Sequence, residues 1–193
     1  MRQLLLVLAL MSAFVFSTRA ADDKDMATNS IVADEAGTLE IVAPKDWTFT
    51  HTNMQMTGNP PSMELHSPSN VIAIRITVYW DGFRGQVSKL DDQDFDKIVS
   101  NVVKQQYLPV SVEKKFVVEK LKGPGVSGSF ARITDAKWSP VMKGAVENEF
   151  KNLATGMFRC GNLWGNFDLL TNDKDGPPFK QGLKVLESLH KKK

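Results

Sequence analysis

Residues 71–80, near the middle of the chain, constrain the fold more than any other segment because their apolar side chains alternate. One side of this segment is entirely apolar, with Ile72, Ile74, Ile76, Val78 and Trp80. The other side is about half apolar, with Val71, Ala73, Arg75, Thr77 and Tyr79. Successive side chains of a β-strand point to opposite faces, so the pattern predicts a central strand that is covered on both sides.

Two segments have the spacing of amphipathic helices. Over 91–108, apolar side chains recur at intervals of three and four, an aspartate can cap the first turn, and Pro109 ends the helix. A last helix begins at Pro177-Pro178, and its apolar stripe runs to His190. Extended segments predict strands over 38–43, 47–50, 63–66, 111–122 and 126–134, and a hairpin of 147–159 with 163–171. This order of strands and helices predicts an α+β fold with an antiparallel sheet.

The N-terminal residues have the layout of a cleaved secretory signal. A positive charge at Arg2 precedes the apolar run 4–16, and small residues lead to a cleavage site after Ala20. The run is too short for a membrane anchor, since a spanning helix takes about 20 residues. We therefore expect a signal peptide over 1–20, a flexible leader over 21–36, and one α+β domain over 37–193 that is periplasmic or secreted.

The net charge and the cysteine content limit the classes of partner that the chain is expected to bind. The chain has 24 basic and 22 acidic residues, and removal of 1–20 takes away two arginines, which leaves a net charge near zero. Such a domain is not expected to bind nucleic acid, and Lys191–Lys193 is expected to be a solvated, frayed end. The single cysteine, Cys160, cannot form an internal disulfide. We expect it to be buried, with pairing to another chain as the alternative, in a monomer or weak dimer.

Three motifs resemble functional sites without their structural context. Residues 123–128 match G-x-G-x-x-G, but a strand-like segment follows them where the dinucleotide motif needs a helix. The acids at 92, 94 and 96 resemble an EF-hand start but lack its glycine and its final glutamate, so we expect them to serve the helix N-terminus. Ser111-x-x-Lys114 leads into a strand rather than a helix. We expect no catalytic residue, metal or cofactor from these motifs.

The three histidines have no metal-ligand spacing. His51 and His66 lie on early strands and could meet in space, so a weak surface metal site stays an alternative. Cys160 with a histidine could form a nucleophile–base pair, although its place at a hairpin end disfavours this. His190 is expected on the last helix.

Three residues are candidates for binding. Trp138 lies in a predicted loop, and Trp164 falls on the polar side of its strand. An exposed tryptophan often anchors a partner or ligand, and the alternative is that both cover helix or loop surfaces. Arg75 lies on the less apolar side of the central strand, where we expect an ion pair and keep a ligand contact as the alternative.

Three stretches resemble the PsbP-like family. They are the strand, Pro and Trp pattern over 39–47, the long strand 71–80 followed by the helix 91–108, and the hairpin with the final helix over 156–189. The resemblance implies a six- or seven-stranded antiparallel sheet with helices packed on both faces, an α/β/α sandwich. It also implies partner binding more often than catalysis, and it assigns no functional residue to a position here.

From these observations we expect an exported, non-catalytic binding or assembly protein with an unknown protein partner or small ligand. One alternative is a small-molecule or lipid carrier, which would need an apolar cavity. The other alternative is a hydrolase of unrecognised type, which would bring His51 or His66 together with carboxylates in a cleft.

Overall fold

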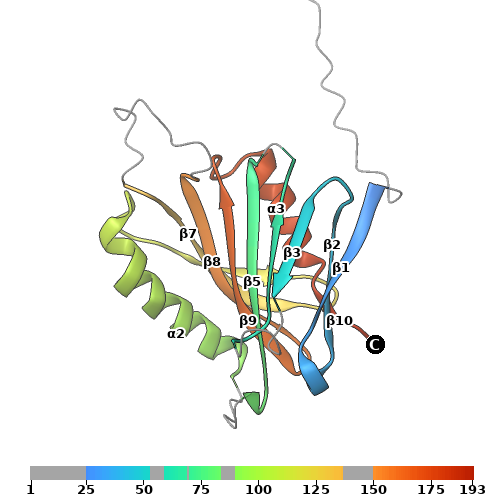
Figure 1. Ribbon diagram of the computed structural model, residues 1–193. Helices are drawn as coiled ribbons and strands as arrows, with labels where there is room; N and C mark the ends of the chain where they lie inside the picture. The colour runs from blue at the N-terminus through green and yellow to red at the C-terminus, as the bar shows by residue number, and fades with distance from the viewer. Residues whose placement is uncertain (1–24, 53–58, 69, 84–89, 137–149) are drawn as a thin grey trace, which may run out of the picture.

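The computed structural model describes residues 25–52, 59–68, 70–83, 90–136 and 150–193 (Figure 1). The predicted signal peptide over 1–20 and the candidate residue Trp138 lie outside these ranges. Among the described residues, no helix has the length and apolar character needed to cross a membrane.

A seven-stranded antiparallel sheet forms the main layer, as predicted, with the strand order β3-β4-β5-β9-β8-β7-β6. Its strands are β3 (Thr48–Thr52), β4 (Ser62–His66), β5 (Ile72–Trp80), β6 (Val118–Lys122), β7 (Ser127–Thr134), β8 (Asn152–Cys160) and β9 (Leu163–Thr171). The predicted hairpin is β8 with β9, and its turn contains Gly161 at a φ of 64°, a conformation that glycine adopts without strain. The G-x-G-x-x-G stretch 123–128 joins β6 to β7, so it does not open a helix.

A second antiparallel sheet of three strands was not predicted. It contains β1 (Met26–Val32), β2 (Thr38–Pro44) and β10 (His190–Lys191), with β2 in the middle. The prediction of a flexible leader over 21–36 is therefore wrong from Met26 onward. Strand β1 pairs with β2 along its whole length, and a short 3-10 turn (Asp34–Ala36) follows it. Ile31 is the one buried residue of β1, so the order of this strand depends on its pairing with β2 and on the burial of Ile31.

The C-terminal lysines are also better ordered than expected. Strand β10 pairs with β2, and Lys192 Nζ lies 3.1 Å from Glu40 Oε1. The last helix ends before His190, so the placement of this histidine on the helix stripe is wrong. His190 Nε2 instead lies 3.2 Å from Glu40 Oε2. The side chain of Glu40 is only 15% exposed, and its pairing with these two residues holds the strand end in place.

The two predicted helices are present with altered ends. Helix α2 (Asp92–Val102) continues into a π-helical turn (Val103–Tyr107) and a 3-10 turn (Leu108–Val110) that contains Pro109. The Asp91 carboxylate caps α2 by accepting hydrogen bonds from the backbone N–H groups of Gln93 and Asp94 at 2.8 and 2.9 Å. The expectation that an aspartate caps this helix is therefore confirmed, with Asp91 as the cap, and Asp94 completes a capping box by accepting a hydrogen bond of 3.2 Å from the Asp91 N–H. Helix α3 is Pro177–Glu187.

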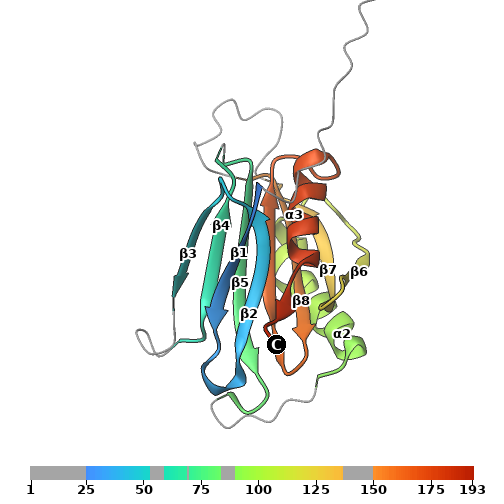
Figure 2. The ribbon, with the colours of Figure 1, turned by 90° about the vertical axis from the view of Figure 1, so that its right-hand side faces the viewer.

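Two apolar clusters hold the layers together. The larger one joins α3 and the three-stranded sheet to the main sheet, and it includes Ala154 and Phe158 of β8. The smaller one joins α2 to β7 and β8 and includes Met157. Figure 1 and Figure 2 show α2 beside β7 and β8, while α3 and β2 cover other parts of the sheet. Neighbouring residues of β8 thus contribute to different clusters, as the alternation of a strand requires.

Candidate functional site

Helix α2 covers only part of its side of the main sheet. It packs over β6, β7 and β8, where Ala131, Ile133 and Met157 are buried against it. In the described chain, no helix covers the same side over β3, β4, β5 and β9, apart from the packing of Trp164 of β9 against the cluster under α2. We call this area the open face; its side chains include Thr50, Glu64, Arg75, Thr77, Asn166 and Asp168. The prediction that β5 is covered on both sides is therefore wrong around Arg75, which is exposed.

The strand register aligns five polar side chains across the open face. Directly opposite residues of antiparallel strands share one face, so the pairings place these residues side by side. Together they form what we call the Arg75 row: Thr50, Glu64, Arg75, Asp168 and Thr155. One guanidinium thus lies between two carboxyl groups, with a threonine at each end.

Arg75 is held in an ion pair, as expected. Its Nε donates a hydrogen bond of 2.7 Å to Glu64 Oε1. The same oxygen lies 3.1 Å from His66 Nε2, and His66 Nδ1 lies 2.9 Å from Asn70 Oδ1. Burial raises the pKa of Glu64, but the hydrogen bonds and charges of Arg75 and His66 outweigh it and hold this pKa below its ordinary value. Glu64 therefore stays ionised and fixes the orientation of the guanidinium.

The terminal nitrogens of Arg75 remain available. The side chain is 60% exposed, and Glu64 bonds only its Nε. In the described part of the chain these terminal nitrogens have no bonded partner. A guanidinium presents its donors as a planar fork that matches a carboxylate or phosphate. Arg75 can therefore accept an oxyanion without losing its ion pair.

Asp168 of β9 lies next to Arg75 in the row, between Arg75 and Thr155. Burial raises the pKa of Asp168, and this effect exceeds the lowering by the Thr155 hydrogen bond and the charge of Arg75. Tyr107 lies close to the same Thr155, and burial together with the charge of Asp168 raises the pKa of Tyr107. Tyr107 ends the π-helical turn after α2. Such turns often occur at functional sites because they redirect a side chain.

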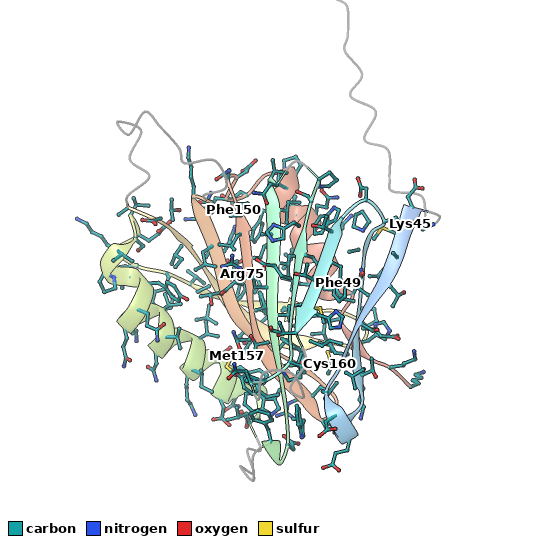
Figure 3. The ribbon with its side chains drawn as sticks, in the orientation of Figure 1. Lys45, Phe49, Arg75, Phe150, Met157 and Cys160 are labelled. Carbon is teal, nitrogen blue, oxygen red and sulfur yellow. The ribbon has the colours of Figure 1, made fainter. Side chains whose placement is uncertain are left out.

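Two surface hollows meet at Arg75. The first, of about 270 Å³, is lined by β3, β4 and β5 side chains that include Thr50, Ser62 and Thr77. The second includes His66 and Phe150 in its lining. Figure 3 shows Arg75 midway along the sheet, with Phe150 nearer to the end of the sheet at which β8 begins. The exposed guanidinium thus borders both hollows.

Trp164 contributes to packing. Its ring stacks on Tyr79 with centroids 4.8 Å apart, and it packs against the cluster under α2. Trp164 was expected on the polar side of its strand, and it does lie on the same side as Asp168. Helix α2 partly covers that side, so the alternative that it covers a helix surface is confirmed. Its Nε1 is buried, and no described residue offers it a hydrogen bond.

The histidines and the cysteine do not form a reactive set. His51 and His66 point to opposite faces of the sheet, and His51 stacks on Phe49 with centroids 5.5 Å apart. Cys160 is 1% exposed, as expected, and burial raises the pKa of its thiol to about 12, so it is not a thiolate nucleophile. Within the described ranges, no group of three His, Cys, Asp or Glu side chains could hold a metal ion.

Sequence reasoning found Arg75 but missed its neighbours Glu64, Asp168, Thr155 and Tyr107. The alternation within 163–171 had already placed Asp168 on a polar side of its strand. Pairing that side with the polar side of β5 would have brought Arg75 and Asp168 together. The pairing itself depends on register between strands about 90 residues apart, which local patterns do not provide.

Comparisons with known proteins give a fold. No protein-family model matches the chain, and neither does any curated protein sequence. The solution structure of cyanobacterial PsbP (CyanoP) from Synechocystis sp. PCC 6803 matches with a TM-score of 0.50 and 11% identity, over 92% of this chain and 99% of that one. A crystal structure from Bacteroides thetaiotaomicron VPI-5482 matches with a TM-score of 0.42 and 11% identity, over 80% of this chain and 45% of that one. The chain therefore has the PsbP-like fold that its opening strand, central strand and closing helix predicted.

Proposed function

We propose that this protein is an exported, non-catalytic binding protein that holds an oxyanion of its ligand or partner on the open face. The observation that carries the proposal is Arg75, an oriented and exposed guanidinium whose terminal nitrogens have no bonded partner among the described residues. The support for export is the charged, apolar and small-residue pattern of 1–20, with cleavage after Ala20 and a periplasmic or secreted destination.

The geometry favours a carboxylate or phosphate as the bound group. Glu64 binds the Nε side of the guanidinium, which leaves the fork of Arg75 directed away from that contact. A bound anion also disfavours the ionised form of nearby Asp168, whose pKa burial already raises. Binding should therefore take up a proton at Asp168, and affinity should increase as the pH falls toward the pKa of this group.

We also infer that the PsbP-like fold has its helices on both sides of the main sheet, as an α/β/α sandwich. Support comes from β8, where Phe158 belongs to the cluster with α3 and Met157 to the cluster with α2. Since neighbouring residues of a strand point to opposite faces, the two helices would lie on different sides. The open face is then the part of this side of the sheet that α2 does not cover.

A titration of the purified, processed protein tests the binding proposal. Succinate and inorganic phosphate serve as probes for the two oxyanion classes, and intrinsic tryptophan fluorescence or calorimetry reports binding. Arg75→Met removes the guanidinium and keeps most of the aliphatic stem. Lys97→Met is the matched control, because Lys97 is 73% exposed on α2 and its loss changes the net charge equally.

We expect Arg75→Met to weaken binding of the preferred probe by about 10-fold or more, the effect of losing a charged hydrogen bond. Lys97→Met should leave the affinity unchanged. Equal affinity for Arg75→Met and the native chain would overturn the proposal, as would an equal loss in both variants. The ratio of succinate to phosphate affinity identifies which oxyanion the site prefers.

A hydrolase is the second candidate, because His66 and Glu64 do converge beside a hollow. His66 Nε2 lies 3.1 Å from Glu64 Oε1, and Asp168 of the same row has a raised pKa, as general acids often have. His66→Asn tests this candidate against a panel of ester, phosphate and glycoside substrates. Turnover by the native protein that is lost in this variant would replace the binding proposal with an enzymatic one.

The carrier alternative gains less support. A carrier needs an apolar cavity, whereas the hollows at Arg75 are surface features lined largely by polar side chains. Between the layers, packing is close at Gly156, where a Cβ atom would lie 2.7 Å from the Phe167 ring. Extraction of the purified protein with organic solvent, followed by mass spectrometry, would show a bound lipid if this alternative were correct.

A further inference from the structure

The two edge strands of the main sheet differ in how they resist pairing with another chain. Edge strands usually carry charges, proline or a cover, because their free N–H and C=O groups otherwise recruit a further strand. Strand β6 carries Glu119, Lys120 and Lys122, which protect it. Strand β3 has the sequence Thr-Phe-Thr-His-Thr, without any Asp, Glu, Lys, Arg or Pro. Four of its five residues are exposed, and Figure 2 shows it at the outer edge of the sheet.

The sequence of β3 is also suited to pairing with itself. We propose that β3 docks antiparallel on β3 of a second copy of this chain, with a two-fold axis through Thr50. This register places Thr48 opposite Thr52 of the second copy, and Phe49 opposite His51. Thr–Thr and aromatic pairs stabilise antiparallel strands, and no like charges oppose each other. A C2 interface of this kind uses the same strand from both copies and closes after two.

Two observations favour a second copy of the chain over an unrelated peptide. Phe49 and His51 already stack within one chain, with centroids 5.5 Å apart and planes at 22°, so the second copy would extend an existing aromatic pair on each side. Phe49 also packs against the main core, which gives the pair a rigid base. By contrast, the same two-fold pairing at β6 would place Lys120 opposite Lys120, which disfavours it.

The dimer would complete the hollow beside Arg75. Thr50, His51 and Thr52 form its outer wall at the edge of the sheet. With β3 paired, the Arg75 row of one copy would continue through Thr50 into the row of the other. The second copy would thus close the edge side of the hollow, and each hollow would be lined by both chains. This inference depends on β3 alone and does not require a ligand at Arg75.

Sedimentation velocity and hydrogen exchange on the full processed chain test the proposal, at concentrations from about 10 µM to about 1 mM, the range of weak dimers. We expect the dimer fraction to rise with concentration, together with slower exchange of the 48–52 amides. Thr50→Lys places two lysines opposite each other at the axis and should weaken the dimer at least about 10-fold. Val117→Lys, at a residue 73% exposed next to β6, is the control and should dimerise like the native chain.

Three results would overturn the proposal. One is a native chain that stays monomeric over the whole range, with exchange at 48–52 independent of concentration. Another is a dimer that Val117→Lys weakens as much as Thr50→Lys. The third is equal dimerisation of native and Thr50→Lys chains, with the fold of the variant verified by circular dichroism. The exchange result on the native chain stands even if a variant fails to fold. Arg75→Met should leave dimerisation intact, so this test and the oxyanion test fail independently.

Discussion

One side of the main sheet has two halves, one covered by α2 and one that we call the open face. The two halves share the same strand alternation but differ in the polarity of their side chains. Under α2, the strands present Ala131, Ile133 and Met157, which are nearly inaccessible to solvent. On the open face, the neighbouring strands present Arg75 and Asp168 in the same alternation. The opposite side of the sheet is mainly apolar in both halves, although Arg132 lies there over the Phe179 ring of α3. Apolar residues are therefore needed where another layer covers the sheet. The Arg75 row is not needed for such packing, and we assign its role to binding.

The boundary between the two halves is built from the end of α2. The π-helical turn after α2 brings Tyr107 close to Thr155, and Thr155 lies directly opposite Asp168 in the sheet. These three side chains connect the packed half to the exposed half. A change in the covered half should therefore affect stability, and a change in the open face should affect binding.

The largest expected effect is on the covered half. Phe95 is fully buried in the cluster under α2, so Phe95→Ala should lower the free energy of unfolding by about 3–5 kcal/mol. Urea denaturation, monitored by circular dichroism, measures this loss of unfolding free energy. Thr50→Ala on the open face is the contrasting variant and should change stability by less than about 0.5 kcal/mol. Similar losses in both variants would break the distinction between the two halves.

At the boundary we expect an intermediate effect. Thr155 is 8% exposed, lies directly opposite Asp168 in the sheet and is close to Tyr107. Thr155→Val keeps the shape and removes a buried hydroxyl beside these two polar side chains, which should cost about 1–3 kcal/mol. Thr52→Val, at an exposed position of β3, provides the control in the same urea experiment. An unchanged midpoint for Thr155→Val would mean that the row ends at Asp168 and is not connected to α2.

Asp168 should give the boundary a pH dependence of definite sign. Burial raises its folded-state pKa above the unfolded value, so the folded state binds more protons between the two values. This group's contribution to stability therefore falls as the pH rises through that window. Asp168→Asn should remove this contribution. The unfolding free energies of the native and variant chains are measured from about pH 3 to pH 7. Their difference gives the contribution of Asp168 alone, because the carboxyl groups with lowered pKa values are present in both chains. A constant difference would contradict the assigned shift.

The smallest stability effect is expected for the open face itself. Arg75 is 60% exposed, and its ion pair with Glu64 is of the surface type. Arg75→Met should change the free energy of unfolding by less than about 1 kcal/mol, although it should weaken oxyanion binding by about 10-fold or more. Thermal and urea unfolding give the free energy of unfolding, and a ligand titration of the same sample gives the oxyanion affinity. A loss of several kcal/mol would show that Arg75 serves the fold.

Local sequence patterns were sufficient for the elements with strong periodicity. The alternation of β5, the helical spacing of α2 and the turn at Gly161 each predict one element from adjacent residues. They could not predict β1 or β10, because β1 lacks apolar alternation, β10 has only two residues, and both depend on pairing with β2. In the case of β10, the paired residues His190 and Glu40 are separated by 150 positions.

The candidate site was predictable only in part for the same reason. Arg75 is conspicuous within an apolar strand, whereas Glu64 and Asp168 become its neighbours only through the register of β4, β5 and β9. Trp164 shows the reverse case. Its strand position suggested exposure, but the sequence did not reveal how far α2 would extend over that side of the sheet.

The most direct test of the central claim is a nitrogen-15 NMR titration of the processed protein with the preferred oxyanion probe, succinate or phosphate. We predict chemical-shift changes at the Arg75 Nε–H and at backbone amides of β4, β5 and β9, with the α2 half unchanged. Shifts centred on the C-terminal lysines, or no saturable shift at Arg75, would contradict the assignment of the open face as the binding surface.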